Sequence, residues 1–202
     1  MGTLTSKELF FDRFLKVLKE QQVDVELKSR GSDKKAAIFA HKLILSGRSE
    51  VFKMMLEPDK CKASSKLETI TLSEMKQEEL EAFVEFIYSD GSMLSEKGKQ
   101  HVRSLYCAAD KYEIPHLRDL CRNELLASLN SSNALDIFVL AHVPYDKALS
   151  DAALATIKAN KSTISTSAEF KVFAINHPDL TIEIVKAISL PYQRYCAYSS
   201  YS

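Results

Sequence analysis

The sequence predicts an α+β domain followed by an all-helical extension. Between residues 21 and 126, short alternating apolar segments typical of half-buried strands are mixed with segments whose apolar residues recur at helical spacing. Beyond Leu129 only helical patterns follow, and they are interrupted by Pro144, Pro178 and a Ser/Thr-rich run at 162–167. Mixed strands and helices followed by helices alone are typical of an α+β domain with an α-helical appendage.

The first predicted element is an N-terminal helix. Thr5 and Glu8 have the spacing of a capping box, which predicts a helix from there to about Glu20. Its apolar arc is wider than one core-facing stripe requires, and it comprises Leu9, Phe10, Phe11, Phe14, Leu15, Val17 and Leu18. Either this helix is deeply buried in its own fold, or one face packs inward and the other packs on a second protein.

A β-hairpin and two short helices are predicted next. Val23, Val25 and Leu27 alternate with polar residues, turn-forming residues follow at 29–34, and residues 36–39 form the returning strand. The stretch from Phe39 to Met55 reads FAHKLILSGRSEVFKMM. It predicts a strand end and two short amphipathic segments, which are separated by a small-residue break at Ser46-Gly47.

The rest of the chain is expected to contain one more strand and several helices. A polar connection at 57–68 precedes a strand at 69–72, and Ser73 is the expected cap of a helix that ends near Tyr88. A turn at 90–92 precedes helices at 102–111 and from Pro115 onward. The extension has helical patterns near 134–141, 147–158, 169–175 and 181–188, and Thr166 with Glu169 forms a second capping-box pattern.

Composition excludes several kinds of partner. Lys and Arg together number 27, as do Asp and Glu, so no net charge favours nucleic acid or a charged membrane surface. No apolar run approaches the length needed to cross a bilayer. The four cysteines contain no CxxC pair and no secretion signal precedes them, so we expect reduced thiols and a cytoplasmic and/or nuclear location.

Motifs for catalysis are missing from the sequence. There is no glycine-rich phosphate loop, no G-x-S-x-G elbow and no H-E-x-x-H helix, so we expect neither an enzyme nor a cofactor. The best metal candidates have spacings that fit no zinc pattern, and they are His101, Cys107, His116 and Cys121. His41 could act as a general base, but a histidine at a strand-to-helix corner more often satisfies buried backbone groups.

The Phe39–Met55 stretch resembles the F-x-A-H-[KR]-x-x-[LI]-x-x-[RS]-S-x-x-F motif of BTB/POZ domains. Further similar blocks are found at 23–25, 86–91, 107–114 and 117–121. Residues 131–180 resemble the BACK-like helices of speckle-type POZ proteins, and the short layout is similar to small plant BTB/POZ proteins. The resemblance implies a dimerisation helix at 1–20, a BTB/POZ domain at 21–126 and a BACK-like extension at 127–190. The terminal position and polarity of residues 191–202 predict a disordered tail there.

The resemblance also implies a dimer. BTB domains commonly pair through the N-terminal helix and a charged pocket beneath it, which here implies Phe10, Phe11 and Phe14 at the interface, with Asp24 and Lys42 at the pocket. Such a dimer would consist of two identical chains or two different BTB proteins, and it would explain the wide apolar arc. The alternative for Asp24 and Lys42 is an ordinary internal ion pair.

The second implication is binding to cullin-3, which would make the chain a non-catalytic adaptor that links an unknown substrate protein to a cullin–RING ubiquitin ligase. The matching contact positions are Met54, Met55, Leu56, Glu57, Tyr112 and His116. One stretch departs from the family pattern, because Lys60-Cys61-Lys62 stands where an apolar-x-Glu motif is expected. The alternative function is a scaffold that pairs with other BTB proteins without recruiting a cullin.

The last twelve residues carry tyrosines at a constant spacing of three, namely Tyr192, Tyr195, Tyr198 and Tyr201. This spacing suits an extended three-fold helix with one aromatic edge. Either the segment is a mobile tail or it is a linear docking or phosphorylation motif.

Overall fold

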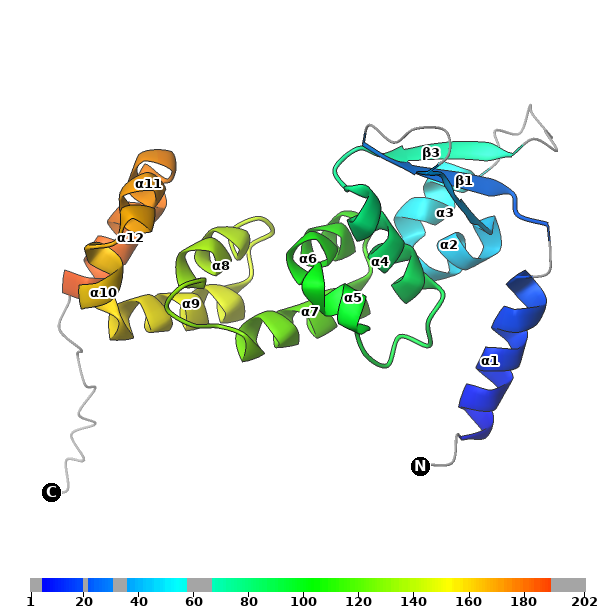
Figure 1. The fold of residues 1–202 in the computed structure, drawn as a ribbon, viewed down its shortest axis with the longest axis horizontal. Helices are drawn as coiled ribbons and strands as arrows, with labels where there is room; N and C mark the ends of the chain where they lie inside the picture. Colours follow the sequence, from blue (N-terminus) through cyan, green and yellow to red (C-terminus); the bar gives the residue numbers. More distant parts are fainter. Residues whose placement is uncertain (1–4, 20–21, 31–35, 58–66, 190–202) are drawn as a thin grey trace, which may run out of the picture. The chain divides into compact units, whose positions relative to one another are not determined.

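The computed structural model describes residues 5–19, 22–30, 36–57 and 67–189. The chain divides into two compact units, Met1–Leu125 and Leu126–Ser202, and the predicted α+β fold with a helical extension is confirmed (Figure 1). Within the described residues, no helix combines the length and the apolar character needed to cross a bilayer. The tyrosine-rich tail and the Lys60-Cys61-Lys62 stretch lie outside the described residues.

The first unit contains a three-stranded sheet in the order β2-β1-β3. Strand β1 (Val25–Ser29) pairs antiparallel with β2 (Ile38–Ala40) and parallel with β3 (Glu68–Leu72). Side chains of β1 alternate between buried and half-buried, as the sequence alternation predicts. Val25, Leu27 and Leu72 are fully buried, so one face of the sheet forms part of the core.

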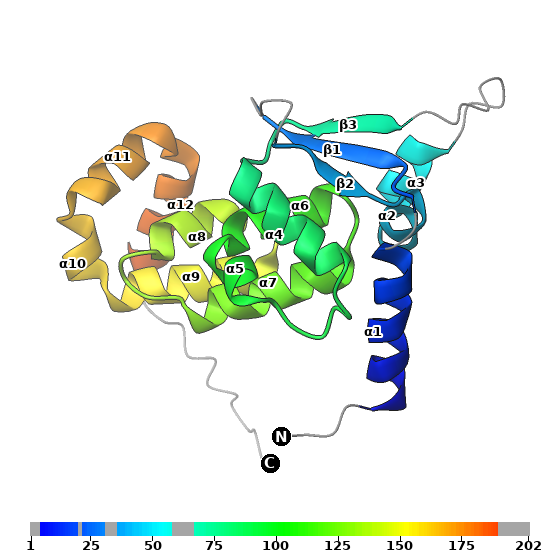
Figure 2. The same cartoon turned by 45° about the vertical axis from the view of Figure 1, so that its right-hand side comes forward.

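Helices α2 (Lys42–Arg48), α3 (Glu50–Leu56) and α4 (Gln77–Ile87) lie beneath this sheet (Figures 1 and 2). The other helices of the first unit are α1 (Ser6–Lys19), α5 (Glu96–Gln100), α6 (Val102–Lys111) and α7 (Pro115–Ala127), whose last residues belong to the second unit. The sequence predicted α6 with the observed bounds and missed α5, whose five residues include no apolar side chain.

Two predicted helix boundaries are wrong. Helix α2 continues through Ser46-Gly47 to Arg48, and the break falls at Ser49, whose backbone is extended. The Ser49 hydroxyl accepts a hydrogen bond from the Phe52 N–H at 3.1 Å and so caps α3. Helix α4 starts at Gln77 instead of after Ser73, because residues 73–75 form a turn and the Lys76 N–H is accepted by Glu79 at 2.8 Å.

An aromatic cluster forms the centre of the first unit. The Phe52 and Tyr112 rings are stacked with centroids 4.6 Å apart, and Phe83 contacts both of them at 6.3 and 5.6 Å. Because these rings come from α3, α4 and the C-terminal end of α6, the cluster joins three helices distant in sequence.

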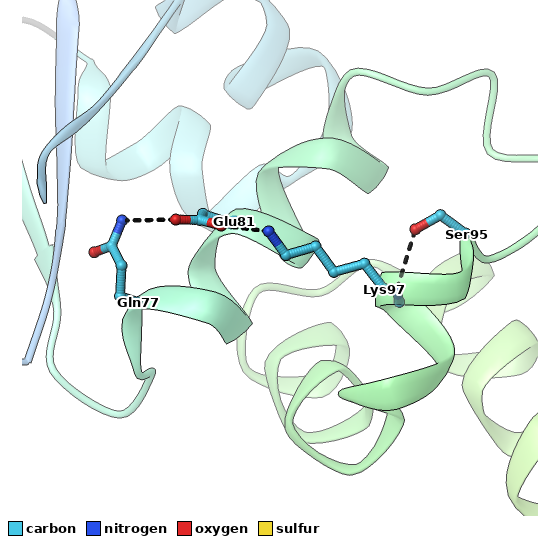
Figure 3. Close-up of polar contacts among 5 residues, drawn as sticks. Gln77, Glu81, Ser95 and Lys97 are labelled. Atoms are coloured by element: carbon cyan, nitrogen blue, oxygen red, sulfur yellow. Dashed lines mark hydrogen bonds and ion pairs between the residues drawn. The ribbon is translucent and has the colours of Figure 1, made fainter.

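Helix α4 is also tied to its neighbours by polar contacts. The Ser29 hydroxyl donates to the Gln77 side-chain oxygen at 2.9 Å, which connects β1 to α4. In Figure 3 the Gln77 amide reaches Glu81, and Glu81 forms an ion pair with Lys97 of α5. The α5 helix is capped by the Ser95 hydroxyl, which accepts the Gly98 N–H at 3.1 Å.

The second unit is helical, as predicted, with α8 (Ala134–Leu140), α9 (Lys147–Ala159), α10 (Lys161–Ser165), α11 (Ala168–Asn176) and α12 (Pro178–Ser189). The Ser/Thr-rich run was expected to be a break, but most of it forms the short helix α10. The second capping box is wrong by one residue, since Ser167 accepts the Phe170 N–H at 3.1 Å, while the Thr166 hydroxyl donates to carbonyls of α10.

Candidate protein-interaction surfaces

The N-terminal helix α1 carries exposed phenylalanines. Phe10 is 70% exposed and Phe14 39% exposed, and their rings are stacked with centroids 6.2 Å apart. Leu9 and Val17 on the same helix are also exposed. Deep burial of the whole apolar arc is therefore wrong, whereas a role as an interface stays a prediction. The side chain of Phe11 lies outside the described part of α1.

Asp24 and Lys42 are in contact, but the contact is a hydrogen bond to the Lys42 backbone and not an ion pair between their side chains. The Asp24 carboxylate accepts the backbone N–H of Lys42 at 2.7 Å, at the N-terminus of α2, where a negative charge is favourable. The Lys42 ammonium instead pairs with Glu68 of β3 at 2.6 Å. An ordinary Asp24–Lys42 ion pair is thus replaced by a three-residue arrangement that joins β3, α2 and the start of the hairpin.

Helix α3 presents two methionines to solvent. Met54 is 60% exposed and Met55 47% exposed, and Glu57 directly after the helix is exposed as well. Leu56, which was predicted at the same surface, is only 5% exposed because it shares the inward face of α3 with Phe52. The helical period places residues four apart on one face, so positions 52 and 56 point inward together.

Tyr112 and His116 were predicted in this set, and the structure places them differently. Tyr112 is only 3% exposed; its ring stacks on Phe52 and its hydroxyl donates to the Glu74 carboxylate at 2.6 Å. Burial and this carboxylate raise the pKa of the Tyr112 hydroxyl. His116 is exposed on α7, and its Nε2 lies 2.5 Å from the carbonyl oxygen of Gly91, a residue with φ +79.

The predicted contact set therefore separates into two parts. Met54, Met55, Glu57 and His116 are accessible, and we call these four residues the α3–α7 surface. Leu56 and Tyr112 belong to the core below and hold α3 in place through apolar contacts. An apolar or aromatic side chain that is nearly fully buried cannot contact a partner unless the domain rearranges, so these two residues act as support in this structure.

His41 has structural contacts at the corner between β2 and α2. It is 7% exposed, and its backbone N–H donates to the Tyr88 hydroxyl at 2.8 Å, while its Nδ1 lies 2.8 Å from the same oxygen. The Tyr88 hydroxyl thus gives the His41 backbone N–H a hydrogen-bond acceptor at this buried corner. Burial raises the pKa of the Tyr88 hydroxyl. Sequence reasoning placed His41 in a structural role but missed Tyr88, which is 47 residues away.

The four metal candidates do not come together as a ligand set. Among the residues that the structure describes, no three His, Cys, Asp or Glu side chains are arranged to hold a metal ion. Cys107 and Cys121 are free thiols. Burial raises the pKa of the Cys121 thiol to about 12 and raises that of Cys107 as well, so both remain protonated near neutral pH and are poor nucleophiles.

Arg48 is a supporting residue that sequence reasoning missed. Its guanidinium donates to the carbonyl of Ile87, the last residue of α4, at 3.1 Å, and to the carbonyl of Ser89 just after the helix. This contact joins α2 to α4 near Gly91, where an added Cβ would lie 3.4 Å from both Arg48 and His116. A lone cation in an amphipathic segment gives no signal of its partner, which explains the omission.

Comparisons with known proteins agree on one family. The model of the BTB/POZ domain matches residues 14–129 of the chain. A putative BTB/POZ domain-containing protein of Arabidopsis thaliana, At4g04090, is 66% identical over 188 residues, which cover 93% of this chain and 98% of the relative. The Arabidopsis BTB/POZ domain-containing protein At5g48510 is 62% identical over 188 residues, which cover 92% of this chain and 84% of the relative.

Among solved structures, the BTB domain of zebrafish PATZ1 is 17% identical to this chain. The match has a TM-score of 0.45 and covers 63% of this chain and 100% of that domain.

Proposed function

Because the chain belongs to the BTB/POZ domain family, a family of protein-interaction modules, we propose that it is a non-catalytic adaptor that dimerises and links a target protein to a cullin-3 ubiquitin ligase. We further propose that it does so in the cytoplasm and/or the nucleus. The α3–α7 surface would receive the cullin, and the exposed phenylalanines of α1 would form the dimer contact.

The observation that carries this proposal is the pair of exposed methionines on α3. Methionine is unbranched and polarizable, so it adapts well to a partner surface, and it is often used at binding surfaces for that reason. Glu57, directly after α3, is exposed and adds a polar group beside the methionines, as at the polar rim of an interface. The α1 phenylalanines lie on a separate element, so dimerisation and cullin binding would not compete for the same side chains.

The test is light scattering of the full chain, alone and with the N-terminal domain of cullin-3. We expect a complex of two chains with two cullin domains. Met54→Asp and Met55→Asp should each weaken binding about 30-fold, since loss of a central anchor costs about 2 kcal/mol. Met93→Asp is a matched control, because Met93 is 71% exposed in the first unit but is not part of the α3–α7 surface.

A second candidate function is supported by one observation in the sequence. Lys60-Cys61-Lys62 replaces the apolar-x-Glu motif expected of strong cullin binders, which removes an apolar anchor and reverses a charge. This favours a scaffold that pairs with other BTB proteins and recruits no ligase. A dimer that ignores the cullin domain at micromolar concentration, with pulldowns that return only BTB proteins, would select this function and rule out the first.

A further inference from the structure

The helical second unit contains a groove between α8 and α11 that none of the contacts described above uses. Leu135, Asp136 and Val139 of α8 line one wall, and Glu169, Val172 and Phe173 of α11 line the other. Each set has helical spacing, so one face of each helix points into the groove. The hollow between them has a volume of about 410 Å³, within the range of roughly 300–1,000 Å³ that ligand sites occupy.

The groove has an apolar floor. Leu135 and Phe173 are 8% and 6% exposed and form the bottom, whereas Val172 is 57% exposed on the wall. The two helices are held apart by other elements of the same unit, since α8 packs on α9, α9 on α12 and α12 on α11. In addition, His142 after α8 lies 3.5 Å from Glu183 of α12. The opening is therefore built into the packing of the unit.

The rim of the groove is acidic. Asp136 and Glu169 are both exposed, and no Lys or Arg is among the described residues that line the groove. Lys171 lies between two lining positions of α11 but does not itself line the hollow. Asn176 and His177 lie at the C-terminal end of α11 and supply polar groups that can hydrogen-bond a peptide backbone.

We propose that this groove binds the target protein, through a short segment that carries an apolar side chain flanked by lysine or arginine. The apolar side chain would fill the hollow above Leu135 and Phe173, and the cations would meet Asp136 and Glu169 at the rim. The lining positions of α11 span nine residues, or roughly 13 Å at 1.5 Å per residue, which accommodates about four residues of extended chain.

This inference rests on the adaptor function proposed above, because a target site is needed only if the chain holds a target. It also supplies a site for the target protein, which an adaptor must hold together with the ligase. A plainer explanation for the two carboxylates is that each lies in the first turn of a helix, where a negative charge stabilises the helix dipole. The experiment below separates the two explanations.

The test measures fluorescence anisotropy of a short labelled peptide of alternating leucine and lysine, titrated with the full chain in the absence of any cullin. We expect saturable binding that weakens as salt increases. Asp136→Asn combined with Glu169→Gln should weaken binding about tenfold. Asp179→Asn is the matched control, because Asp179 lies in the first turn of α12 and does not line the groove.

A second pair of variants tests the apolar part. Val172→Ser should also weaken binding about tenfold, and Ile175→Ser on the same helix should leave it unchanged, since Ile175 is 79% exposed and outside the groove. Thermal unfolding of each variant checks that the unit is folded. The proposal is overturned if the peptide does not bind, if a leucine–glutamate peptide binds equally well, or if groove and control variants behave alike.

The peptide and cullin experiments fail independently. Peptide binding without cullin binding would support the groove as the target site of a scaffold and overturn the ligase function. Cullin binding without peptide binding would support the adaptor function and overturn the groove as its target site.

Discussion

At the scale of single residues, the contact between Tyr88 and His41 shows how one hydroxyl completes a buried corner. The Tyr88 oxygen lies 2.8 Å from both the backbone nitrogen and the Nδ1 of His41, and His41 is 7% exposed. In such a place a polar group without its partner costs its full desolvation energy, so this hydroxyl matters more to stability than an exposed one.

We expect Tyr88→Phe to lower the free energy of unfolding by about 1–3 kcal/mol, because the ring stays while both contacts to His41 are lost. Denaturant titration followed by circular dichroism measures this change. Tyr145→Phe is the control, since Tyr145 is 67% exposed, and its change should stay within about 0.5 kcal/mol. Equal effects of the two substitutions would show that the Tyr88 hydroxyl has no special role.

At the scale of whole elements, α1 and α3 both carry more apolar surface than their own unit buries. In α3 the inward face contributes Phe52 and Leu56 to the core and leaves Met54 and Met55 outside. In α1 the stacked Phe10 and Phe14 rings are themselves exposed. Exposed apolar helix faces are typical of interaction surfaces, and we propose that the two elements serve different partners.

Phe10→Asp combined with Phe14→Asp should give a folded monomer. Burying two carboxylates at a two-fold interface without partners is unfavourable, and the loss of one aromatic anchor alone should weaken dimerisation about 30-fold. Light scattering measures the mass, and circular dichroism confirms the helix content. Met93→Asp should leave the dimer intact, and an unchanged dimer in the Phe variant would refute the interface.

At the scale of the molecule, the first unit is held together in part by carboxylates whose pKa values are lowered. Burial alone would raise the pKa of Glu74, but hydrogen bonds from Lys111 and Tyr112 outweigh it and keep the pKa below 4.5. In Glu79, hydrogen bonds from Lys76 and Ser104 likewise outweigh burial. The ion pair with Lys97 lowers the pKa of Glu81. These contacts join the turn after β3, α4, α5 and α6.

Stability of the first unit should therefore fall on acidification. A carboxylate with a lowered folded-state pKa stabilises the fold above its unfolded-state pKa, near 4.5, and this contribution is lost as the pH falls through the lower folded-state value. Urea unfolding at a series of pH values from about 7 to about 3 should show a decline that begins near pH 5. Glu74→Gln should make the decline shallower, and a stability that is constant or rises on acidification would contradict the assignment.

Much of the secondary structure was predictable from local pattern alone. The hairpin, the strand at 69–72, helix α6 and the helical character of the second unit all follow from apolar periodicity and turn residues. The BTB/POZ family was predictable too, because its motif is a local stretch that the chain matches at nearly every position, with Ile38 in place of the first Phe. Met54 and Met55 were expected at a surface only through the family resemblance; both are exposed, and their role as contacts stays a prediction.

The sequence by itself therefore determined the fold class, most of the elements and the family, because those depend on spacing along the chain. Only the tertiary structure decided where α2 ends, since the Ser49 hydroxyl donates to the carbonyl of Tyr112, 63 residues away, at 2.5 Å. It also decided that Leu56 and Tyr112 are core residues and that Lys42 pairs with Glu68. Burial and ion pairing depend on which segments distant in sequence are in contact, and local periodicity carries no information about those contacts.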